Sequence, residues 1–224
     1  MKTMFFATFG TMASGKTKAL IETLQTEKSK GLRTCCLSPE MTRCRNNDEN
    51  KVSNRSQLKN ITGFVTSRDG MKTETIFVDQ DEDLAKMFRS LKKNAHSYPF
   101  QPIKIVDVIF VDEIQFFSTE QILQLKAISK EIKVCTYGLF YDCDRKEFTS
   151  SRLCLDSSNF SFELFAKCES CNGVSYQDCL VKSGNTIEKT EKPFIGINDR
   201  YLSLCLECVE KLKDSYFDHE VFRG

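Results

Sequence analysis

Tryptophan is absent from this chain of 224 residues, which contains only four prolines and two histidines. Long hydrophobic runs are also missing, which argues against a membrane span, and no signal peptide is visible. An excess of charge of either sign is missing as well, because 32 basic and 31 acidic side chains leave a net charge of +1. A near-neutral chain has no broad basic field for nucleic acid, so we expect neither a membrane nor a nucleic acid as partner.

The remaining composition is that of an ordinary folded protein, with 40% hydrophobic and 28% charged residues. The length allows one large domain, or one domain with a second, smaller one. Eleven cysteines are a high count, but their number is odd, they are scattered and no secretion signal accompanies them. We therefore expect a reducing, cytoplasmic location, with some of the cysteines bound to a metal.

The clearest motif is GTMASGKT at residues 10–17, which fits the phosphate-loop pattern G-x-x-x-x-G-K-[ST]. A short apolar segment precedes it, and residues 16–31 have the apolar spacing of a helix that ends near Gly31. A glycine turn that matches by chance is the alternative. In a phosphate loop, backbone N–H groups and the following helix N-terminus bind phosphate oxygens, the lysine reaches the outer phosphates and the threonine binds Mg²⁺. The predicted ATP-binding residues here are Gly10, Thr11, Met12, Ala13, Ser14, Gly15, Lys16 and Thr17.

Strand-like and helix-like segments alternate up to about residue 140, which predicts an α/β fold with a mostly parallel sheet. The long β-branched run at residues 103–113 predicts a strand that is buried on both faces. Residues 43–60 are polar and predict a long exposed loop, and after residue 140 the alternation fades. Further strands are expected at residues 33–38, 75–79 and 132–139, and helices at residues 81–94 and 119–131, the last with a capping box of Ser118 and Gln121.

Two acids, Asp112 and Glu113, end the long apolar run. The carboxyl ends of parallel strands face the ligand crevice, and the phosphate loop follows another such end. We therefore expect the acids beside the phosphates, where they organise Mg²⁺ or accept a proton from an attacking hydroxyl. Solvated acids at a strand end are the alternative. The combination indicates a nucleoside triphosphate, without separating a hydrolase from a kinase.

Two cysteine pairs, Cys168-x-x-Cys171 and Cys205-x-x-Cys208, provide the four thiolates of a tetrahedral zinc site. A redox pair and a fortuitous arrangement in a cysteine-rich chain are the alternatives. A structural zinc ion would contribute directly to the free energy of folding.

The order of these motifs resembles the type II thymidine kinases, the zinc-containing tetrameric class. The resemblance spans nearly the whole chain and is carried by GTMASGKT, SRDG, VDEIQFF, DRKEF, CESC, IG and YLSLCLEC. It implies transfer of the ATP γ-phosphoryl group to the 5′-hydroxyl of thymidine, with Mg²⁺. It also implies a P-loop NTPase-like (RecA-like) sheet with helices on both faces over residues 1–163, and a small zinc-binding domain with a lasso loop over residues 164–224.

The resemblance further implies roles for individual residues. Glu113 matches the catalytic base, Asp112 joins the phosphate site, and Arg43 matches an arginine near the metal. Matches to the nucleoside site are Met12, Phe116, Leu139, Phe148, Asp178, Phe194, Gly196 and Tyr201. The implied partners are ATP, thymidine, other copies of this chain in a dimer or tetramer, and the end-product triphosphate as an inhibitor.

The sequence also departs from the family's pattern. Asp178 stands where a thymidine-facing threonine is common, and Met41 where an acid near Mg²⁺ is usual. Further departures are Ala13, Phe140, Cys143, Leu180 and Ile197. Three hypotheses remain: an active thymidine kinase, a kinase with altered nucleoside specificity, and an ATP-binding relative with weak catalysis that serves as a scaffold. An ATPase coupled to nucleic acid would need basic or aromatic surfaces for the strand.

Overall fold

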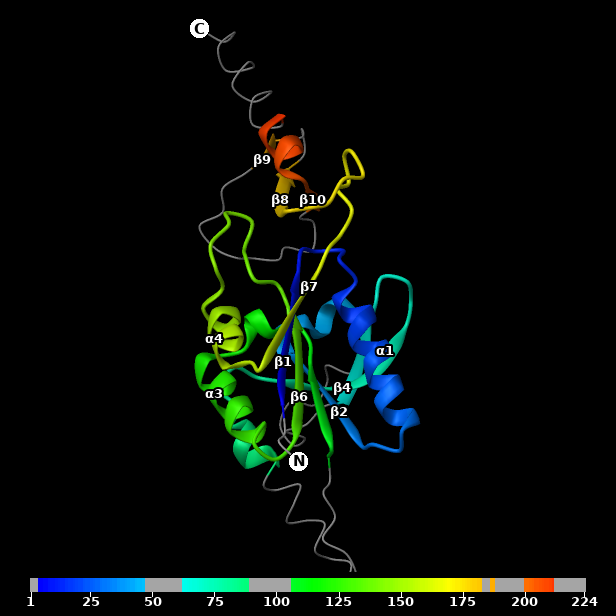
Figure 1. Ribbon diagram of the computed structural model, residues 1–224, viewed down its shortest axis with the longest axis vertical. Helices are drawn as coiled ribbons and strands as arrows, with labels where there is room; N and C mark the ends of the chain where they lie inside the picture. Colours follow the sequence, from blue (N-terminus) through cyan, green and yellow to red (C-terminus); the bar gives the residue numbers. More distant parts are fainter. Residues whose placement is uncertain (1–3, 47–61, 89–105, 183–185, 188–199, 212–224) are drawn as a thin grey trace, which may run out of the picture.

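The computed structural model describes residues 4–46, 62–88, 106–182, 186–187 and 200–211. Within these residues a seven-stranded sheet forms the centre of the molecule (Figure 1). In spatial order its strands are β3 (Thr62–Thr66), β4 (Lys72–Val78), β2 (Thr34–Pro39), β5 (Val108–Val111), β6 (Lys133–Gly138), β1 (Phe5–Gly10) and β7 (Phe160–Leu164). A three-stranded sheet lies beyond the carboxyl end of β1, with the strands β10 (Arg200–Leu204), β8 (Gln177–Lys182) and β9 (Thr186–Ile187).

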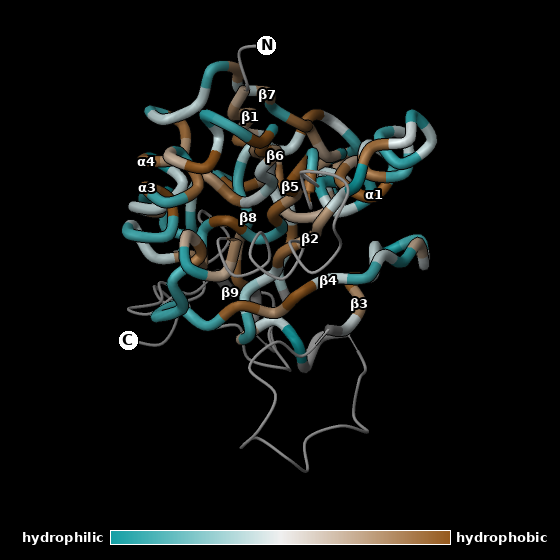
Figure 2. Tube along the Cα trace, turned by 90° about the horizontal axis from the view of Figure 1, so that it is seen from below, coloured by the Kyte–Doolittle hydropathy of each residue, from teal (hydrophilic) through white to brown (hydrophobic). Residues whose placement is uncertain are grey.

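Among the described strands of the large sheet, β3 and β4 form the antiparallel pair and the other neighbours are parallel. Helix α1 (Lys16–Ser29) covers one face, whereas α3 (Thr119–Ile128) and α4 (Thr149–Ser157) cover the other (Figure 2). The predicted α/β fold is therefore confirmed. In the part of the chain that the structure describes, no helix combines the length and the apolar character that crossing a membrane requires.

Strand β5 shows why a strand in the middle of the sheet can be an unbroken apolar run. Ile109 and Val111 are fully buried on the α3 and α4 side, and Val108 and Phe110 are buried on the α1 side. Successive side chains of a strand point to opposite faces, so a strand covered on both faces favours apolar residues at successive positions. Each such side chain contributes about 1.5–3 kcal/mol through burial.

Several predicted elements are confirmed with small shifts in their ends. The capping box is present: Ser118 Oγ accepts the Gln121 N–H, and the Gln121 side chain accepts the Ser118 N–H. Helix α1 ends as expected, because Gly31 adopts a left-handed φ of 80° just after its last turn. Of the helix expected at residues 81–94, residues 84–88 are helical, and residues 89–94 lie outside the described residues.

Other predictions of local structure are wrong. The strand expected at residues 103–113 is confined within the described residues to β5, because Asp112 and Glu113 already belong to a turn. Residues 43–46 of the expected loop belong to the 3-10 helix η1 (Glu40–Asn46), and residues 47–60 lie outside the described residues. Regular structure also continues after residue 140, because α4 and β7 complete the large sheet and its cover.

Glu27, near the end of α1, is a buried acid with only 7% of its surface exposed. Its carboxylate accepts hydrogen bonds from Lys133 Nζ at 3.0 Å and from Lys30 Nζ at 3.4 Å. Burial opposes ionisation, but the two lysines outweigh it, so the pKa of Glu27 lies below its ordinary value of 4.5.

Replacing Glu27 with glutamine is expected to lower the free energy of unfolding by about 1–2 kcal/mol near neutral pH, because charge-assisted hydrogen bonds are lost. A depressed pKa stabilises the fold above the unfolded-state value, and this contribution disappears as pH falls through the folded-state pKa. The difference between the two proteins should therefore shrink below pH 4.5. Urea titrations at neutral and acidic pH measure it, with the exposed Glu22→Gln as control. A difference that is independent of pH would contradict the ion-pair explanation.

Candidate active site

The phosphate loop connects β1 to α1 in a conformation that directs its backbone amides inward. Ala13 and Gly15 adopt left-handed φ values of 59° and 81°, and such turns make a concave nest of N–H groups. Gly10 is required for a different reason, because a Cβ there would collide with the Leu164 carbonyl oxygen and with Ser14 Oγ. Gly15 is the N-cap of α1 and provides no side-chain cap. The loop and the first turn of α1 are therefore suited to bind an anion.

Lys16 lies within this loop with its amine folded back on the backbone. Its Nζ donates to the Thr11 carbonyl at 2.7 Å and to the Gly10 carbonyl at 3.1 Å. Burial lowers the pKa of Lys16, and the negative charges of Glu113, Asp178 and Asp112 oppose this shift. A buried cation whose hydrogen bonds go to two neutral carbonyls is suited to exchange them for phosphate oxygens.

Asp112 lies just after β5 and contacts the start of α1. Thr17 Oγ1 donates to Asp112 Oδ2 at 3.2 Å, so the phosphate loop and the acid share one edge of the sheet. Burial, followed by the negative charge of Glu113, raises the pKa of Asp112 to about 7. A hydroxyl and a carboxylate are oxygen ligands of the kind that Mg²⁺ prefers. Ser14 Oγ is buried without a hydrogen-bond partner among the described residues, so these groups fit a magnesium nucleotide.

Glu113 follows directly, with a left-handed φ of 49°, and begins the 3-10 helix η3 (Ile114–Phe116). Its carboxylate accepts a hydrogen bond from Gln115 Nε2. The other side-chain atom of Gln115, Oε1, accepts the Leu139 N–H at 3.0 Å. Gln115 therefore ties the acid to the end of β6. Sequence reasoning assigned Gln115 no role, although it lies two residues after Glu113 in the motif VDEIQFF.

Apart from Tyr201, the described residues predicted to bind the nucleoside fall into two groups. Near Glu113, the rings of Phe116 and Phe148 meet edge to face with their centroids 6.3 Å apart. The Leu139 carbonyl accepts a hydrogen bond of 2.6 Å from Ser151 Oγ. Beside the phosphate loop, Asp178 Oδ2 accepts the Met12 N–H at 2.7 Å.

The remaining predicted residues belong to neither of these two groups. Tyr201 lies on β10 opposite Leu180. Arg43 pairs with Glu40 at 2.6 Å and lies 4.5 Å from the ring of Phe77. Phe194, Gly196 and Ile197 lie outside the described residues.

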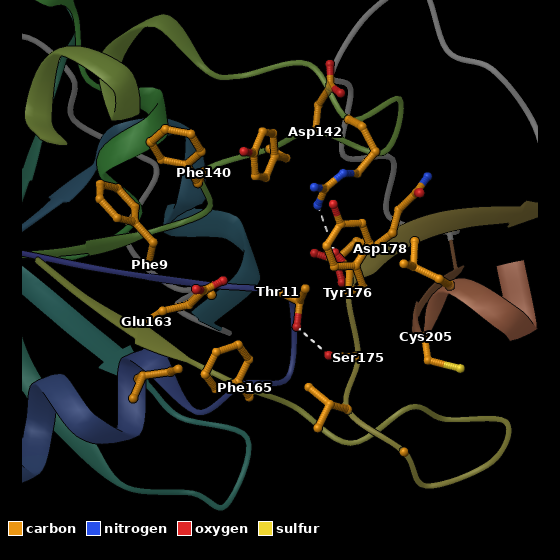
Figure 3. Close-up of a pocket in the computed structure, with 18 of the residues that line it drawn as sticks. Phe9, Thr11, Phe140, Asp142, Glu163, Phe165, Ser175, Tyr176, Asp178 and Cys205 are labelled. Atoms are coloured by element: carbon orange, nitrogen blue, oxygen red, sulfur yellow. Dashed lines mark hydrogen bonds between the residues drawn. The ribbon is translucent and has the colours of Figure 1, made fainter.

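An open cleft of about 900 Å³ lies beside the phosphate loop (Figure 3). One wall includes Phe140 and Phe165, the other includes Tyr176 and Asp178, and Thr11 lies between them. Its described lining includes Asp178 but not Met12, Phe116, Leu139, Phe148 or Tyr201. The cleft is therefore distinct from the surroundings of Phe116 and Phe148.

The four predicted zinc ligands lie together, with Cys205 directly after the end of β10. The Sγ atoms of Cys168, Cys171, Cys205 and Cys208 all lie within 4.8 Å of one another, and Cys171 and Cys205 are 3.6 Å apart. Burial opposes ionisation of Cys168, but hydrogen bonds from backbone N–H groups outweigh it and lower the pKa of this thiol to about 6. Four thiolates at this spacing fit a tetrahedral zinc ion.

Replacing Lys16 with alanine is expected to weaken magnesium-nucleotide binding by about 10–100-fold, because hydrogen bonds to charged groups each contribute about 1.5–3 kcal/mol. Titration calorimetry with a non-hydrolysable ATP analogue measures the change. Lys18→Ala is the matched control, since Lys18 lies on the same helix but is exposed and pairs with Asp69 at 2.9 Å. Equal nucleotide affinities for the wild-type and Lys16→Ala proteins would remove Lys16 from the phosphate site.

Comparison with known proteins agrees with this geometry. Residues 4–209 match the model of the family described as thymidine kinase. The thymidine kinase of Photobacterium profundum is 30% identical over 149 residues, which cover 64% of this chain and 71% of that protein. The thymidine kinase of Enterobacteria phage T4 is 26% identical over 200 residues, covering 88% and 91%. That of Idiomarina loihiensis is 25% identical over 207 residues, covering 92% and 94%.

Proposed function

Because this chain belongs to the thymidine kinase family, we propose that it transfers the γ-phosphoryl group of ATP to the 5′-hydroxyl of thymidine. The structural observation that carries this proposal is the hydrogen bond between Thr17 and Asp112. It joins the phosphate loop after β1 to the acids after β5, although β6 lies between these strands. A phosphate donor and a proton-accepting carboxylate then share one edge of the sheet, as phosphoryl transfer to an alcohol requires.

Each part of the site has a defined task in this reaction. The nest around Gly15 and the amine of Lys16 bind the phosphates, which places the γ-phosphoryl group and offsets its charge. Glu113 accepts the proton of the attacking hydroxyl, and Gln115 holds the Glu113 carboxylate in place. Thr17 and Asp112 would hold Mg²⁺, which neutralises charge on the phosphates when bound. Arg43 is proposed as a further cation near the bound metal.

The aromatic pair of Phe116 and Phe148, with Leu139, is proposed as the wall of the nucleoside pocket. Its position beside Glu113 supports this role, because an acceptor hydroxyl must come within hydrogen-bond distance of the base. Met12, Asp178, Phe194, Gly196 and Tyr201 complete the proposed pocket.

The C-terminal part of the chain is proposed to be a structural zinc unit over residues 164–224, which follows the nucleotide-binding domain of residues 1–163. In support, β7 is the last described strand of the large sheet and ends at Leu164, and β8 begins the separate small sheet at Gln177. A reducing, cytoplasmic location is part of this proposal, since it keeps the four thiols available for zinc.

Self-association into a dimer or tetramer is also proposed. Strand β7 lies at an edge of the large sheet, and Phe160 and Phe162 are each about half exposed there. Apolar side chains on an unpaired strand edge favour pairing with another chain, here a second copy. The end-product triphosphate is proposed as an inhibitor at the same substrate site. Native mass spectrometry, with and without this nucleotide, tests both statements.

A nucleoside panel tests the proposed activity. The purified protein is mixed with magnesium ATP and each nucleoside in turn, and the 5′-monophosphate is quantified by chromatography. We expect thymidine-dependent formation of thymidine monophosphate and ADP in equal amounts, and formation of both products about 10²–10⁴-fold more slowly in Glu113→Gln. Phosphorylation of another nucleoside in preference to thymidine would overturn the substrate assignment. ADP release that needs no nucleoside and rises with added DNA would indicate an ATPase instead.

A further inference from the structure

The four residues 175–178, which lead into β8, contact two different loops of the large domain. On one side they hold the phosphate loop. The hydroxyls of Ser175 and Thr11 are hydrogen-bonded at 2.8 Å, drawn as a dashed line in Figure 3. Asp178 Oδ2 accepts the Met12 N–H at 2.7 Å. These two bonds fix consecutive residues of the phosphate loop.

On the other side the same segment holds the loop of residues 139–148, which contains Leu139 and Phe148 of the proposed nucleoside pocket. The Arg145 guanidinium lies between the rings of Tyr141 and Tyr176, at 4.0 and 3.9 Å from their centroids. It also donates to the Tyr176 carbonyl at 2.9 Å. Gln177 Nε2 donates to the Cys143 carbonyl at 2.8 Å. Ser175 and Asp178 thus contact the phosphate loop. Tyr176 and Gln177, which lie between them, contact the loop of residues 139–148.

The segment is in turn anchored to the cysteine cluster. The Tyr176 N–H donates to the Leu204 carbonyl at 2.7 Å, directly before Cys205. Glu169, directly after Cys168, exchanges two hydrogen bonds of 2.9 Å with Ser203, through its N–H and its Oε1. Ser203 Oγ lies 2.6 Å from Asp178 Oδ1 and 2.7 Å from the Met12 carbonyl. A continuous set of hydrogen bonds therefore runs from residues adjacent to the predicted zinc ligands to the phosphate loop.

We propose that residues 175–178 form a clasp that fixes the phosphate loop relative to the loop of residues 139–148, with Asp178 as its central positioning residue. This inference rests on the proposed function, in which the two loops hold the two substrates. The open cleft beside Thr11 separates residues 175–178 from β7. On the side of the cleft, residues 175–178 are therefore connected to the large domain through the hydrogen bonds to Thr11 and Met12. Phosphoryl transfer depends on alignment of donor and acceptor, and a displacement of about 1 Å can reduce the rate about 100-fold.

The two oxygens of Asp178 explain why a carboxylate suits this position. Oδ2 is engaged by the Met12 N–H and Oδ1 by Ser203 Oγ, and the side chain is 93% buried, with 7% of its surface exposed. Asparagine can reproduce this arrangement. Its Oδ1 would accept the Met12 N–H, and its amide would donate to Ser203 Oγ, whose hydrogen can turn to the Met12 carbonyl. Alanine leaves the Met12 N–H without its partner.

Two readouts test the clasp on the full chain with zinc bound. Hydrogen exchange by mass spectrometry follows peptides that cover residues 8–17 and 139–148. Steady-state kinetics gives kcat and the KM for ATP and for thymidine. Asp178→Ala and Asp178→Asn test the contact with the phosphate loop, and Gln177→Met tests the contact with residues 139–148. The exposed Glu210→Gln, also in the C-terminal part of the chain, is the control. Gln177→Met also keeps the proposal testable if Asp178→Ala fails to fold.

We expect Asp178→Ala to speed exchange in residues 8–17 about tenfold and to reduce kcat/KM for ATP by about 10–100-fold. In Asp178→Asn, exchange in residues 8–17 should stay within about threefold of wild type. Gln177→Met should instead speed exchange in residues 139–148 and raise the KM for thymidine. Unchanged exchange in a folded Asp178→Ala would overturn the proposal. Exchange in residues 8–17 of Asp178→Asn as fast as in Asp178→Ala would also overturn it, because the negative charge and not the hydrogen bond would then hold the loop.

The exchange experiment separates this proposal from the proposed function. If wild type phosphorylates no nucleoside, the kinase assignment fails, but exchange in residues 8–17 and 139–148 still shows whether the segment holds both loops. If wild type phosphorylates thymidine and exchange is unaffected in every variant, the kinase assignment stands and the clasp fails.

Discussion

A Glu113→Gln protein is expected to bind magnesium ATP as wild type does and to turn over about 10²–10⁴-fold more slowly, the range for loss of a general base. Glutamine has nearly the same shape and still interacts with Gln115, so the turn between β5 and η3 should be preserved. Its amide accepts no proton from the attacking hydroxyl. The loss should therefore appear in kcat, with little change in the KM for ATP. Rapid-quench measurement of a single turnover isolates the chemical step.

Two variants serve as comparisons for Glu113→Gln. Glu120→Gln removes an exposed acid from the first turn of α3 and should leave kcat unchanged. Gln115→Met removes the hydrogen bonds to Glu113 and to the Leu139 N–H, so its effect should lie between those of the other two. If Glu113→Gln keeps the wild-type single-turnover rate, another group removes the proton and Glu113 has no role as the base.

The second large effect is expected from the cysteine cluster. Replacing Cys168 with serine removes one of four thiolates that lie within 4.8 Å of one another. Zinc binding to structural sites of small domains has an apparent free energy of about 10–16 kcal/mol, so most of the order in the small sheet should depend on it. We expect loss of the metal, rapid hydrogen exchange in residues 166–182, and a smaller effect on β1 and α1. Elemental analysis and exchange mass spectrometry measure these changes.

Cys179→Ser is the matched control for this experiment. Cys179 is buried in the same unit, with 1% of its surface exposed, but it is not one of the four clustered cysteines. The control should lose stability and keep one zinc ion per chain. Wild-type protein without zinc, or a Cys168→Ser protein that retains it, would end the assignment of the cluster as a zinc site.

Much of the central architecture could be predicted from local pattern. The phosphate loop and α1 follow from GTMASGKT and its apolar helix face, and the capping box of α3 follows from Ser118 and Gln121. Strand β5 is recognisable because both of its faces are covered and all of its residues are apolar. Strand β6 is also buried at five of its six positions, although the polar Thr136 interrupts its apolar residues. The four cysteines could be grouped because a metal site requires a small set of residue types at short spacing.

The elements that the sequence analysis missed lack such patterns. Strand β7 lies at the sheet edge, with four of its five residues exposed, so Phe160 and Phe162 show no contrast between a buried and an exposed face. Helix α4 begins with polar residues and buries three serines, whose hydroxyls bond to backbone carbonyls or pack in the interior. Strand β3 depends on antiparallel pairing with β4, which is a tertiary contact.

The candidate site divides in the same way. Lys16, Thr17, Asp112 and Glu113 could be placed together because parallel strands deliver their carboxyl ends to one edge. The partners of Asp178 could not, because its contacts with Met12 and Ser203 join positions 166 and 25 residues apart along the chain. No spacing rule connects such residues, and only the packing of the small sheet against the phosphate loop brings them together.

Strand β1 is the earliest described strand of this chain, and both of its neighbours come much later in the sequence. Its partners are residues 134–138 of β6 and residues 160–164 of β7. Until those residues have emerged, the nascent chain carries the apolar segment FFATF without a pairing partner, a condition that favours aggregation and chaperone binding. Closing such long loops is also slow, so the nucleotide-binding strand is made well before the two strands that complete its pairing.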